Sequence, residues 1–302
     1  MNLSAPMLKV IFTALFVVAC WGYSPTGIHI GLLAYGPGHL ALLRFLIASL
    51  FMALMALVYG IRRPRSRDLP LLIVLGFFAV SLHHVVLNIG QQGVSAGVSS
   101  VLAQTTPLFS TVLARFLFKD QVSAWRWGCI FVGMLGVAIV VGGDHGFGEI
   151  NAHGLLILVA AVSWSLYFAL QKHHAQRYDG LTLVCYTVWS GTALLLVYLP
   201  GLAQRVIDAP LEVNAAVLGL GIFPSALAYL GWAYVLKHVD LSRAAMTLYL
   251  IPPTAMLIAA LMLGEQPGLM VVIGAAVVLL SVLALNLERR AVTVRASTPR
   301  AG

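Results

Sequence analysis

Long apolar stretches alternate with short polar connections along almost the whole chain. Ten of these stretches are roughly twenty residues long and carry few charges, so each can cross a hydrocarbon core of about 30 Å as a helix. They cover residues 8–30, 38–60, 70–91, 95–117, 125–142, 154–175, 181–200, 213–236, 241–263 and 268–287. Because the connections are mostly short, the pattern predicts an all-α integral membrane protein with ten transmembrane helices.

Part of this pattern occurs twice. Residues 75–121 align with residues 220–266 at a constant offset of 145 positions, without a gap. The identical positions are Leu75, Gly76, Phe78, Leu82, Val94, Pro107, Ala114 and Gln121. Such duplication is typical of transporters and predicts one five-helix repeat in residues 1–145 and another in residues 146–302. Since five is an odd number, the second repeat enters the membrane from the opposite side, and we expect the two repeats to be inverted copies.

The composition leaves little material for a water-facing domain. Hydrophobic residues make up 60% of the chain and charged residues 9%, whereas soluble domains carry about 25% charged residues. The first apolar stretch is longer than the apolar core of a signal peptide, about 7–15 residues. It also has the bulky Trp21 where a cleavage site needs small residues. We therefore expect this stretch to be a transmembrane helix.

The positive charges collect on one side of the predicted membrane. The net charge is +8 at pH 7, and nearly all Lys and Arg residues lie near the termini or in every second connection. The other connections contain Arg205 alone, together with Asp144, Glu149, Asp208, Glu212 and Glu265. The positive-inside rule then predicts a multi-pass protein of the cell (inner or plasma) membrane with both termini in the cytoplasm. The basic residues thus indicate topology, and no nucleic-acid partner is expected.

Several short motifs carry a resemblance to a known family. They are Cys20-Trp21-Gly22, Leu43-Arg44-Phe45, Val94-Ser95-Ala96-Gly97, Thr106-Pro107-Leu108-Phe109, and Pro252 followed by Gly264-Glu265. With them, residues 10–287 resemble the EamA-type permeases of the drug/metabolite transporter superfamily, with Lys119-Asp120 where that family has Gly-Glu. The resemblance implies a ten-helix basket whose central cavity is lined by helices 1, 3, 4, 6, 8 and 9. It also implies efflux or exchange of small metabolites, often amino acids.

Polar side chains at membrane depth are candidates for substrate contact, since they are costly there unless they face a cavity or a partner. His84 aligns with Tyr229 in the second repeat, and His84, Asn88 and Gln91 share one helical face. Substrate contact by His84 or Asn88 stands beside an alternative, in which this face makes hydrogen bonds between helices. His83 points elsewhere and is expected to be structural.

Two aligned prolines mark a second pair of candidates. Gln104 and Tyr249 occupy equivalent positions, each three residues before a proline, Pro107 or Pro252. A proline inside a helix kinks it and leaves a carbonyl without its donor, which a substrate could then approach. We expect the kinked helices to gate the cavity, with the alternative that the prolines only shape the helices.

Aromatic residues supply the third pair. Trp21 and Trp164 lie 143 positions apart, about midway along their helices, and two facing indoles would form an apolar box for a side chain or a cation. Tyr167 and Trp232 extend the same faces. The alternative is packing in the helix core. Arg44 is expected to snorkel to the membrane interface in a structural role.

The acidic residues narrow the mechanism. All ten Asp and Glu residues fall in loops or at helix ends, so no intramembrane carboxylate is available as a proton relay. No nucleotide-binding motif, metal-ligand spacing or catalytic constellation is visible, so we expect no cofactor, no metal and no enzymatic activity. A membrane-embedded enzyme and a non-transporting scaffold are the alternatives from other classes, and the sequence leaves homodimer formation open.

The sequence therefore predicts an inner-membrane transporter that works by alternating access around a central cavity, with a small-molecule solute and the lipid bilayer as its partners. The predicted solutes are small neutral or zwitterionic metabolites such as amino acids, either exported or exchanged. The alternative is efflux of lipophilic cationic drugs or lipid-like compounds.

Overall fold

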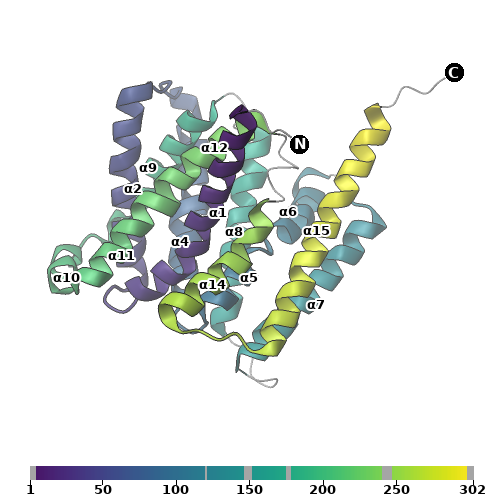
Figure 1. The fold of residues 1–302 in the computed structure, drawn as a ribbon. Coiled ribbons are helices and arrows are strands. Elements are labelled where there is room, and N and C mark those ends of the chain that lie inside the picture. The colour runs from purple at the N-terminus through teal and green to yellow at the C-terminus, as the bar shows by residue number, and fades with distance from the viewer. Residues whose placement is uncertain (1–4, 120, 146–151, 175–177, 240–246, 298–302) are drawn as a thin grey trace.

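The computed structural model describes residues 5–119, 121–145, 152–174, 178–239 and 247–297, and every regular element within them is helical (Figure 1). The first half contains α1 (Ala5–Gly31), α2 (Pro37–Tyr59), η1 (Ser66–Asp68), α3 (Leu69–Gly76), η2 (Phe77–Leu82), α4 (His83–Gly90), α5 (Ala96–Ala103), α6 (Thr106–Phe118) and α7 (Ala124–His145). The second half contains α8 (Ala152–His174), α9 (Gly180–Leu195), η3 (Leu196–Tyr198), α10 (Leu202–Asp208), α11 (Leu211–Ile222), η4 (Phe223–Leu227), α12 (Ala228–His238), η5 (Leu248–Leu250), α14 (Ile251–Leu263) and α15 (Leu269–Ser297).

The described residues of the ten predicted apolar stretches are mostly helical. Seven described helices are long and apolar enough to cross a membrane, and two further apolar helices, Leu248–Leu263 and Leu269–Leu285, are shorter. The stretch 95–117 is divided into α5 and α6. Large apolar side chains such as Leu57 and Leu211 lie exposed on the outside of the bundle, as expected for a surface that faces lipid.

Helix ends recur at the offset of 145 positions. The ends of α6 and α14 correspond at both termini, and each helix is followed by a residue with left-handed backbone, Lys119 (φ 58°) and Gly264 (φ 69°). The next helices, α7 and α15, begin at Ala124 and Leu269. The two halves thus share helix boundaries in addition to identical residues.

Both halves also contain a π-helical turn inside a long apolar helix. η2 lies between α3 and α4, and η4 lies at the corresponding place between α11 and α12. Pro224 in η4 has no backbone N–H to donate, and the neighbouring Ser225 hydroxyl donates to the Leu220 carbonyl over 2.8 Å. Turns of this kind are rare and are often found at functional sites.

Two equivalent glycines let neighbouring helices approach closely. A Cβ added to Gly76 of α3 would lie 2.8 Å from the Thr187 carbonyl oxygen of α9. One added to Gly221 of α11 would lie 3.0 Å from the Arg44 carbonyl oxygen of α2. Since Gly76 corresponds to Gly221, these contacts make Thr187 the counterpart of Arg44, 143 positions later in the chain.

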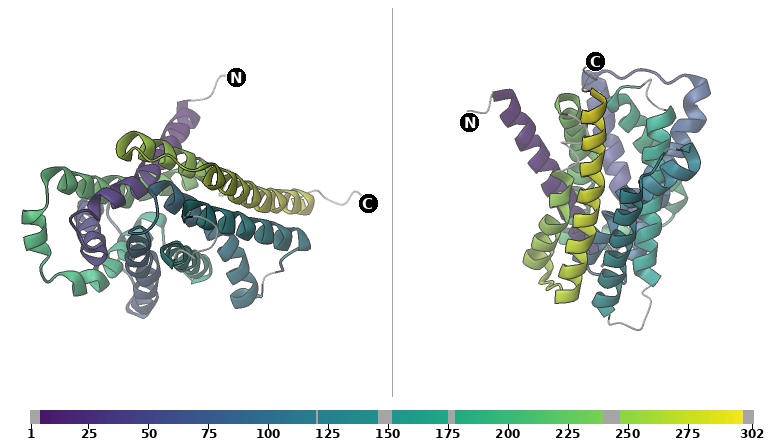
Figure 2. Two further views of the ribbon diagram at one scale, coloured as in Figure 1. Left: turned by 90° about the horizontal axis from the view of Figure 1, so that it is seen from below. Right: turned by 90° about the vertical axis from the view of Figure 1, so that its right-hand side faces the viewer.

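α7 and α15 lie side by side at one edge of the bundle (Figure 2). A Cβ added to Gly133 would lie 2.6 Å from Ser281 Oγ, and one added to Gly136 would lie 2.9 Å from the Val278 backbone nitrogen. At the offset of 145 positions, Gly133 corresponds to Val278 and Gly136 corresponds to Ser281. The contact between Gly133 and Ser281 is therefore equivalent to the contact between Gly136 and Val278. These helices pair as a twofold axis between the halves would require.

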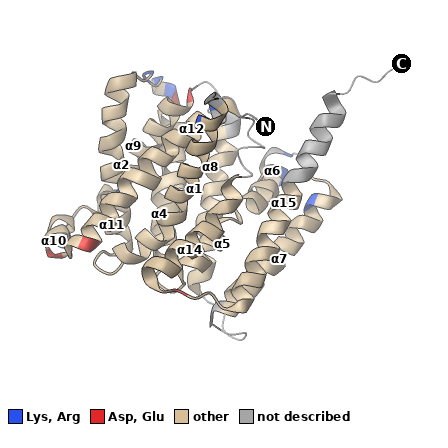
Figure 3. Ribbon diagram, viewed as in Figure 1, with Lys and Arg blue, Asp and Glu red and all other residues tan. Residues whose placement is uncertain are grey.

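Charged side chains concentrate at the two ends of the bundle (Figure 3). Lys and Arg gather at the end where α2 finishes, and α1 begins and α15 finishes at this same end (Figure 1). Asp and Glu lie at both ends, beside α10 and in the connection between α14 and α15 at one end, and next to the basic residues at the other. The middle of the bundle is left almost entirely to apolar and uncharged polar residues.

Candidate functional site

Five aromatic side chains from three helices gather in the middle of the bundle, and we call them the aromatic cluster. They are Trp21 of α1, Trp164 and Tyr167 of α8, and Tyr229 and Trp232 of α12. The Tyr229 ring meets Trp21 edge-on at 6.1 Å between centroids and Trp164 at 6.2 Å. Trp232 lies 5.7 Å from Trp21, and Tyr167 lies 5.2 Å from Trp164. Such edge-on and tilted contacts stabilise aromatic pairs, so Tyr229 joins the two predicted tryptophans into one surface.

Arg44 of α2 lies beside this cluster and is buried, with 3% of its surface exposed. Its Nε donates to Ser225 Oγ over 2.5 Å, and its Nη1 lies 3.5 Å from Nδ1 of His84. The guanidinium carbon also lies 5.5 Å from the centroid of the Phe45 ring. The prediction that Arg44 snorkels to the interface is wrong, because α4, α11 and η4 cover this face of α2 and Ser225 supplies an acceptor inside the bundle.

The two adjacent histidines have different surroundings. The His83 ring packs on the Trp164 ring with 4.8 Å between the centroids. Its Nδ1 lies 2.8 Å from the Ala160 carbonyl oxygen and donates a hydrogen bond to it. His84 packs on Phe45 at 4.6 Å and is buried. Since Arg44 can only donate, Nδ1 of His84 is the acceptor in that contact. The proton of a neutral His84 ring is then on Nε2, an atom that is buried and has no hydrogen-bond partner among the described residues.

Asn88 and Gln91 continue the polar face of α4. Asn88 Nδ2 donates to the Pro37 carbonyl over 2.9 Å, and Gln91 Nε2 donates to the Pro25 carbonyl over 2.5 Å. Each amide therefore ties α4 to a neighbouring helix, as the alternative interpretation expected. Their oxygens, Asn88 Oδ1 and Gln91 Oε1, are buried and have no partner among the described residues.

The two prolines begin helices instead of kinking them. A short break separates α5 from α6, and η5 precedes α14, so Pro107 and Pro252 lie in the first helical turn, where no N–H is needed. The carbonyls that they leave free belong to Ala103 and Leu248. The first accepts the Thr106 hydroxyl at 2.8 Å, and the second accepts Gln104 Nε2 at 2.9 Å. Each of these carbonyls thus has a donor within the protein, which favours the alternative that the prolines shape their helices.

Gln104 lies in the break between α5 and α6, and Tyr249 lies in η5, which leads directly into α14. Tyr249 Oη donates to the Val282 carbonyl of α15 over 3.1 Å. Gln104 joins the break in the first half to η5 in the second half. Their predicted contact with a substrate stays a prediction.

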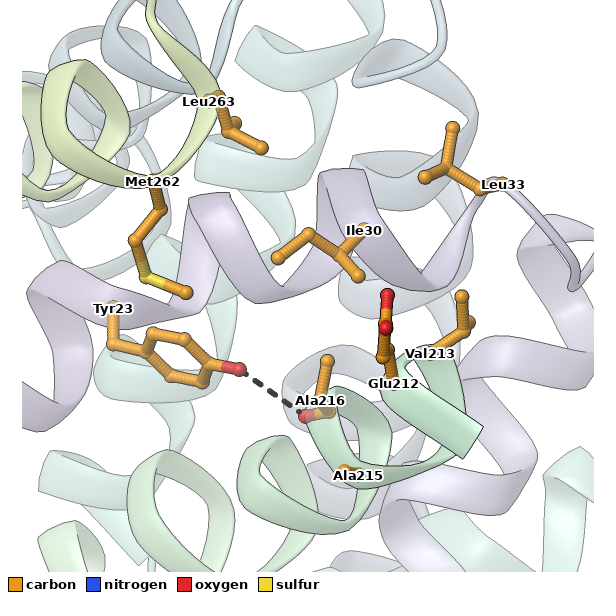
Figure 4. A pocket seen from close by; sticks show the side chains of 9 residues that line it. All are labelled: Tyr23, Ile30, Leu33, Glu212, Val213, Ala215, Ala216, Met262 and Leu263. Carbon is orange, nitrogen blue, oxygen red and sulfur yellow. Dashed lines mark hydrogen bonds between the residues drawn. The ribbon is translucent and has the colours of Figure 1, made fainter. Parts of the chain in front are cut away.

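A cavity of about 550 Å³ opens between α1, α11 and α14, at the end of the bundle near α10 (Figure 4). Its walls are formed by Tyr23, Ile30, Leu33, Glu212, Val213, Ala215, Ala216, Met262 and Leu263. The Tyr23 hydroxyl donates to the Ala216 carbonyl over 3.4 Å at the inner side of this cavity. None of the residues predicted for the site is among its walls, so the cavity stops short of the aromatic cluster.

The sequence profile of the EamA-like transporter family matches the chain twice, over residues 8–142 and over residues 153–287. The chain belongs to this family. It is an EamA-type permease of the drug/metabolite transporter superfamily, and hence a multi-pass membrane transporter for a small-molecule solute. The prediction of the family from its motifs is confirmed.

Relatives of this transporter are similar over most of their length. The uncharacterized transporter YdfC of Bacillus subtilis (strain 168) is 35% identical over 89% of this chain and 88% of its own length. A probable terminal-alkyne amino-acid exporter of Streptantibioticus cattleyicolor is 32% identical over 96% of this chain and 98% of its own length. A probable amino-acid metabolite efflux pump of Salmonella typhimurium (strain LT2) is 26% identical over 89% and 91%.

A solved crystal structure has the same fold as this EamA-like transporter. It superposes with a TM-score of 0.63 at 18% identity and covers 94% of this chain and 98% of the other. At this identity the likeness extends to the fold alone.

In this EamA-like transporter, some predicted site residues meet and others do not. The cluster brings together five of the six predicted Trp and Tyr residues, without Tyr249, and His84 lies at its edge, 6.5 Å from Trp164. Sequence reasoning missed Ser225 and Tyr23 and gave Arg44 a peripheral place. A charged residue inside the apolar stretch 38–60 was the available signal, but its depth depended on which helices cover α2.

Proposed function

We propose that this transporter crosses the membrane ten times as two inverted five-helix repeats, residues 1–145 and 146–302, with both termini in the cytoplasm. The helix ends, π turns and close glycine contacts that recur at one offset support the duplication. Inverted repeats supply inward- and outward-facing states of similar energy, and this permits alternating access to a solute held between them.

The proposed solutes are small neutral or zwitterionic metabolites, amino acids among them, which are exported or exchanged. The aromatic cluster carries this proposal, because it unites residues of both halves at mid-bundle and offers an apolar surface beside polar groups. His84 and Asn88 at its edge, with Gln104 in the break between α5 and α6 and Tyr249 in η5, are the proposed polar contacts. The names of two relatives, which refer to amino-acid export, agree with this class.

We expect transport without proton coupling and without chemical change of the solute. The apolar stretches contain no Asp or Glu in their interiors, so a fixed carboxylate relay is missing. Only a histidine could carry protons at depth. Accumulation driven by a pH gradient, and abolished by His84→Ala, would contradict this expectation.

Pro107 and Pro252 are proposed to act in gating. Each lies in the first turn of its helix, Pro107 after the break between α5 and α6 and Pro252 after the 3-10 turn η5, where backbone rotation needs few hydrogen bonds to change. Replacing either proline with Ala should lower the turnover rate more than substrate binding. Equal loss of both quantities would indicate that the prolines only shape their helices.

A second candidate function is efflux of lipophilic cations or lipid-like compounds. The cavity favours it, because its walls are mostly apolar and it opens between α1, α11 and α14. Aromatic faces can also hold a cation. Under this alternative, the hydrogen bonds of Asn88 and Gln104 should be dispensable.

Counterflow in proteoliposomes tests the proposal. Vesicles containing the purified protein are loaded with one L-amino acid at a time, and uptake of the same labelled amino acid is followed with and without a pH gradient. We expect counterflow of at least one neutral amino acid, unchanged by the gradient. Trp164→Ala should lower it about tenfold or more, whereas Trp127→Ala, at an exposed position of α7, should keep it. Counterflow of tetraphenylphosphonium without any amino acid would favour the second candidate.

A further inference from the structure

Arg44 and Asp68 are the buried charged residues in the part of the chain that the structure describes. Asp68 lies in η1 and accepts a hydrogen bond from Tyr178 Oη over 2.6 Å. For Arg44, no carboxylate of a described residue lies within salt-bridge distance, and its acceptors are the neutral Ser225 and His84. Burying a cation without an anion is very costly, and buried charges in proteins are therefore paired almost without exception.

The Arg44 guanidinium still has donors to offer. It carries five N–H groups in a planar fork, and two of its nitrogens have partners among the described residues. A fork of this shape matches the two oxygens of a carboxylate. Ser225 holds Nε and thereby orients the other side of the fork, while Nε2 of His84 lies close by without a partner.

The second half of the chain argues against a purely structural role. Thr187 occupies the counterpart of Arg44, and it packs against Gly76 as Arg44 packs against Gly221. The counterpart of Ser225 at the offset of 145 is Val80, which is buried and apolar. If the close helix contact needed a charge, both halves would need one. The contact forms twice, but the charge is present once.

The surroundings of Arg44 fit a small amphipathic solute. Phe45 and His84 contact the guanidinium, at 5.5 Å from the Phe45 ring centroid and 3.5 Å from Nδ1 of His84. The His84 ring in turn lies 6.5 Å from the Trp164 ring. Pro224, next to the Ser225 that holds Arg44, accepts a hydrogen bond from Trp21 Nε1 over 3.1 Å. Trp21 and Trp164 belong to the aromatic cluster, so a solute bound at Arg44 has this cluster close by.

We propose that Arg44, held by Ser225 and assisted by His84, binds the carboxylate of the transported solute. This inference rests on the proposed function and names the chemical group that the site requires. The solute supplies the anion that the bundle lacks, and its apolar part lies against the aromatic cluster. A solute without a carboxylate leaves the guanidinium unpaired, and a lipophilic cation is repelled by it.

Thermal unfolding of the purified protein with matched probes tests this binding. The probes are L-phenylalanine and 3-phenylpropanoate, which carry a carboxylate, and 3-phenylpropanamide and 2-phenylethylamine, which do not. A ligand that binds only the folded state raises Tm, so the carboxylates should raise it and the two others should not. Equal shifts by 3-phenylpropanoate and 3-phenylpropanamide, or no shift by either carboxylate, would overturn the proposal without any variant.

Two variants locate the effect. Arg44→Gln should remove the carboxylate-specific shift, and Arg44→Lys, which keeps the charge but loses the fork, should retain part of it. Thr187→Val, at the counterpart position, should leave the shift unchanged. A carboxylate-specific shift that persists in Arg44→Gln would overturn the assignment to Arg44.

Counterflow separates this inference from the proposed function. If the Arg44→Gln variant exchanges a neutral amino acid as fast as the wild type, the proposal that Arg44 binds the carboxylate is wrong and the proposed function stands. If the wild type binds 3-phenylpropanoate through Arg44 but exchanges no amino acid, carboxylate binding by Arg44 stands and the proposed solute class, amino acids, is wrong. Thermal shifts by tetraphenylphosphonium alone would overturn both.

Discussion

The two halves of this transporter share their backbone and differ in their chemistry. Each half has a π turn, a glycine that admits a neighbouring helix, and a helix with a proline in its first turn. At equivalent places, however, the first half has Arg44 and His84, and the second has Thr187 and Tyr229. Backbone shape is thus repeated in the two halves, and side chains diverge where they meet the middle of the bundle.

This contrast separates the requirements of the fold from those of the site. A feature present in both halves is explained by helix packing, because it serves the same neighbours twice. A feature present once needs another explanation, and Arg44 with Ser225 is the clearest case. Substitutions at equivalent positions of the two halves can therefore test whether a residue serves helix packing or the site.

The largest effect is expected at the paired glycines. Gly76→Leu and Gly221→Leu should each destabilise the protein by about 3 kcal/mol, since their side chains would overlap α9 and α2. Thermal unfolding and the yield of monodisperse protein measure this loss. Gly128→Leu is the control, because a Cβ at Gly128 has no neighbour within 4 Å. A clear difference between Gly76 and Gly221 would break the packing equivalence.

An intermediate effect is expected at the serines of the two π turns. Ser225→Ala removes the acceptor of Arg44 Nε, and a lost hydrogen bond to a buried donor costs about 1–3 kcal/mol. We expect roughly a tenfold weaker apparent affinity in counterflow, corresponding to about 1.4 kcal/mol. Ser81→Ala removes a neutral bond to the Gly191 carbonyl (2.9 Å) and should lower stability without this loss of affinity. Equal affinity in both variants would contradict a special role for Ser225.

The smallest effect is expected at the ends of α6 and α14. Lys119 and Gly264 share a left-handed backbone, which costs a residue with a Cβ roughly 1 kcal/mol. Lys119→Gly should raise stability, and Gly264→Ala should lower it, each by about this amount. Gly268→Ala in the neighbouring connection, where a Cβ has open space, is the control. Opposite signs at Lys119 and Gly264, measured by thermal unfolding, confirm the shared geometry.

Much of the fold could be predicted from the sequence. Length and hydropathy give ten helical stretches, and the alignment of Pro107 with Pro252 gives the register that α6 and α14 follow. The aromatic cluster could also be anticipated, because Trp21 and Trp164 recur at nearly the same offset. Periodicity and spacing contain this information directly.

The remainder depends on contacts between distant segments. The burial of Arg44 requires knowing that η4 covers α2, and the π turns leave no recognisable signal in the apolar pattern. Gln104 is polar at depth, and its amide donates to the Leu248 carbonyl that Pro252 leaves free, a pairing that the sequence does not indicate. Only the tertiary structure distinguishes a polar group with a protein partner from one without.

Alternating access itself is tested most directly by accessibility at one equivalent pair, Ala216 of α11 and Leu71 of α3. Ala216 lines the cavity, and its counterpart Leu71, 145 positions earlier, is half-buried near the basic end. Single cysteines replace each residue in a variant without Cys20, Cys129 and Cys185, and impermeant maleimide labels each from its own side of the membrane. An exchanged amino acid that slows labelling at Ala216→Cys should speed labelling at Leu71→Cys. Labelling rates that rise or fall together at the two positions would contradict alternating access.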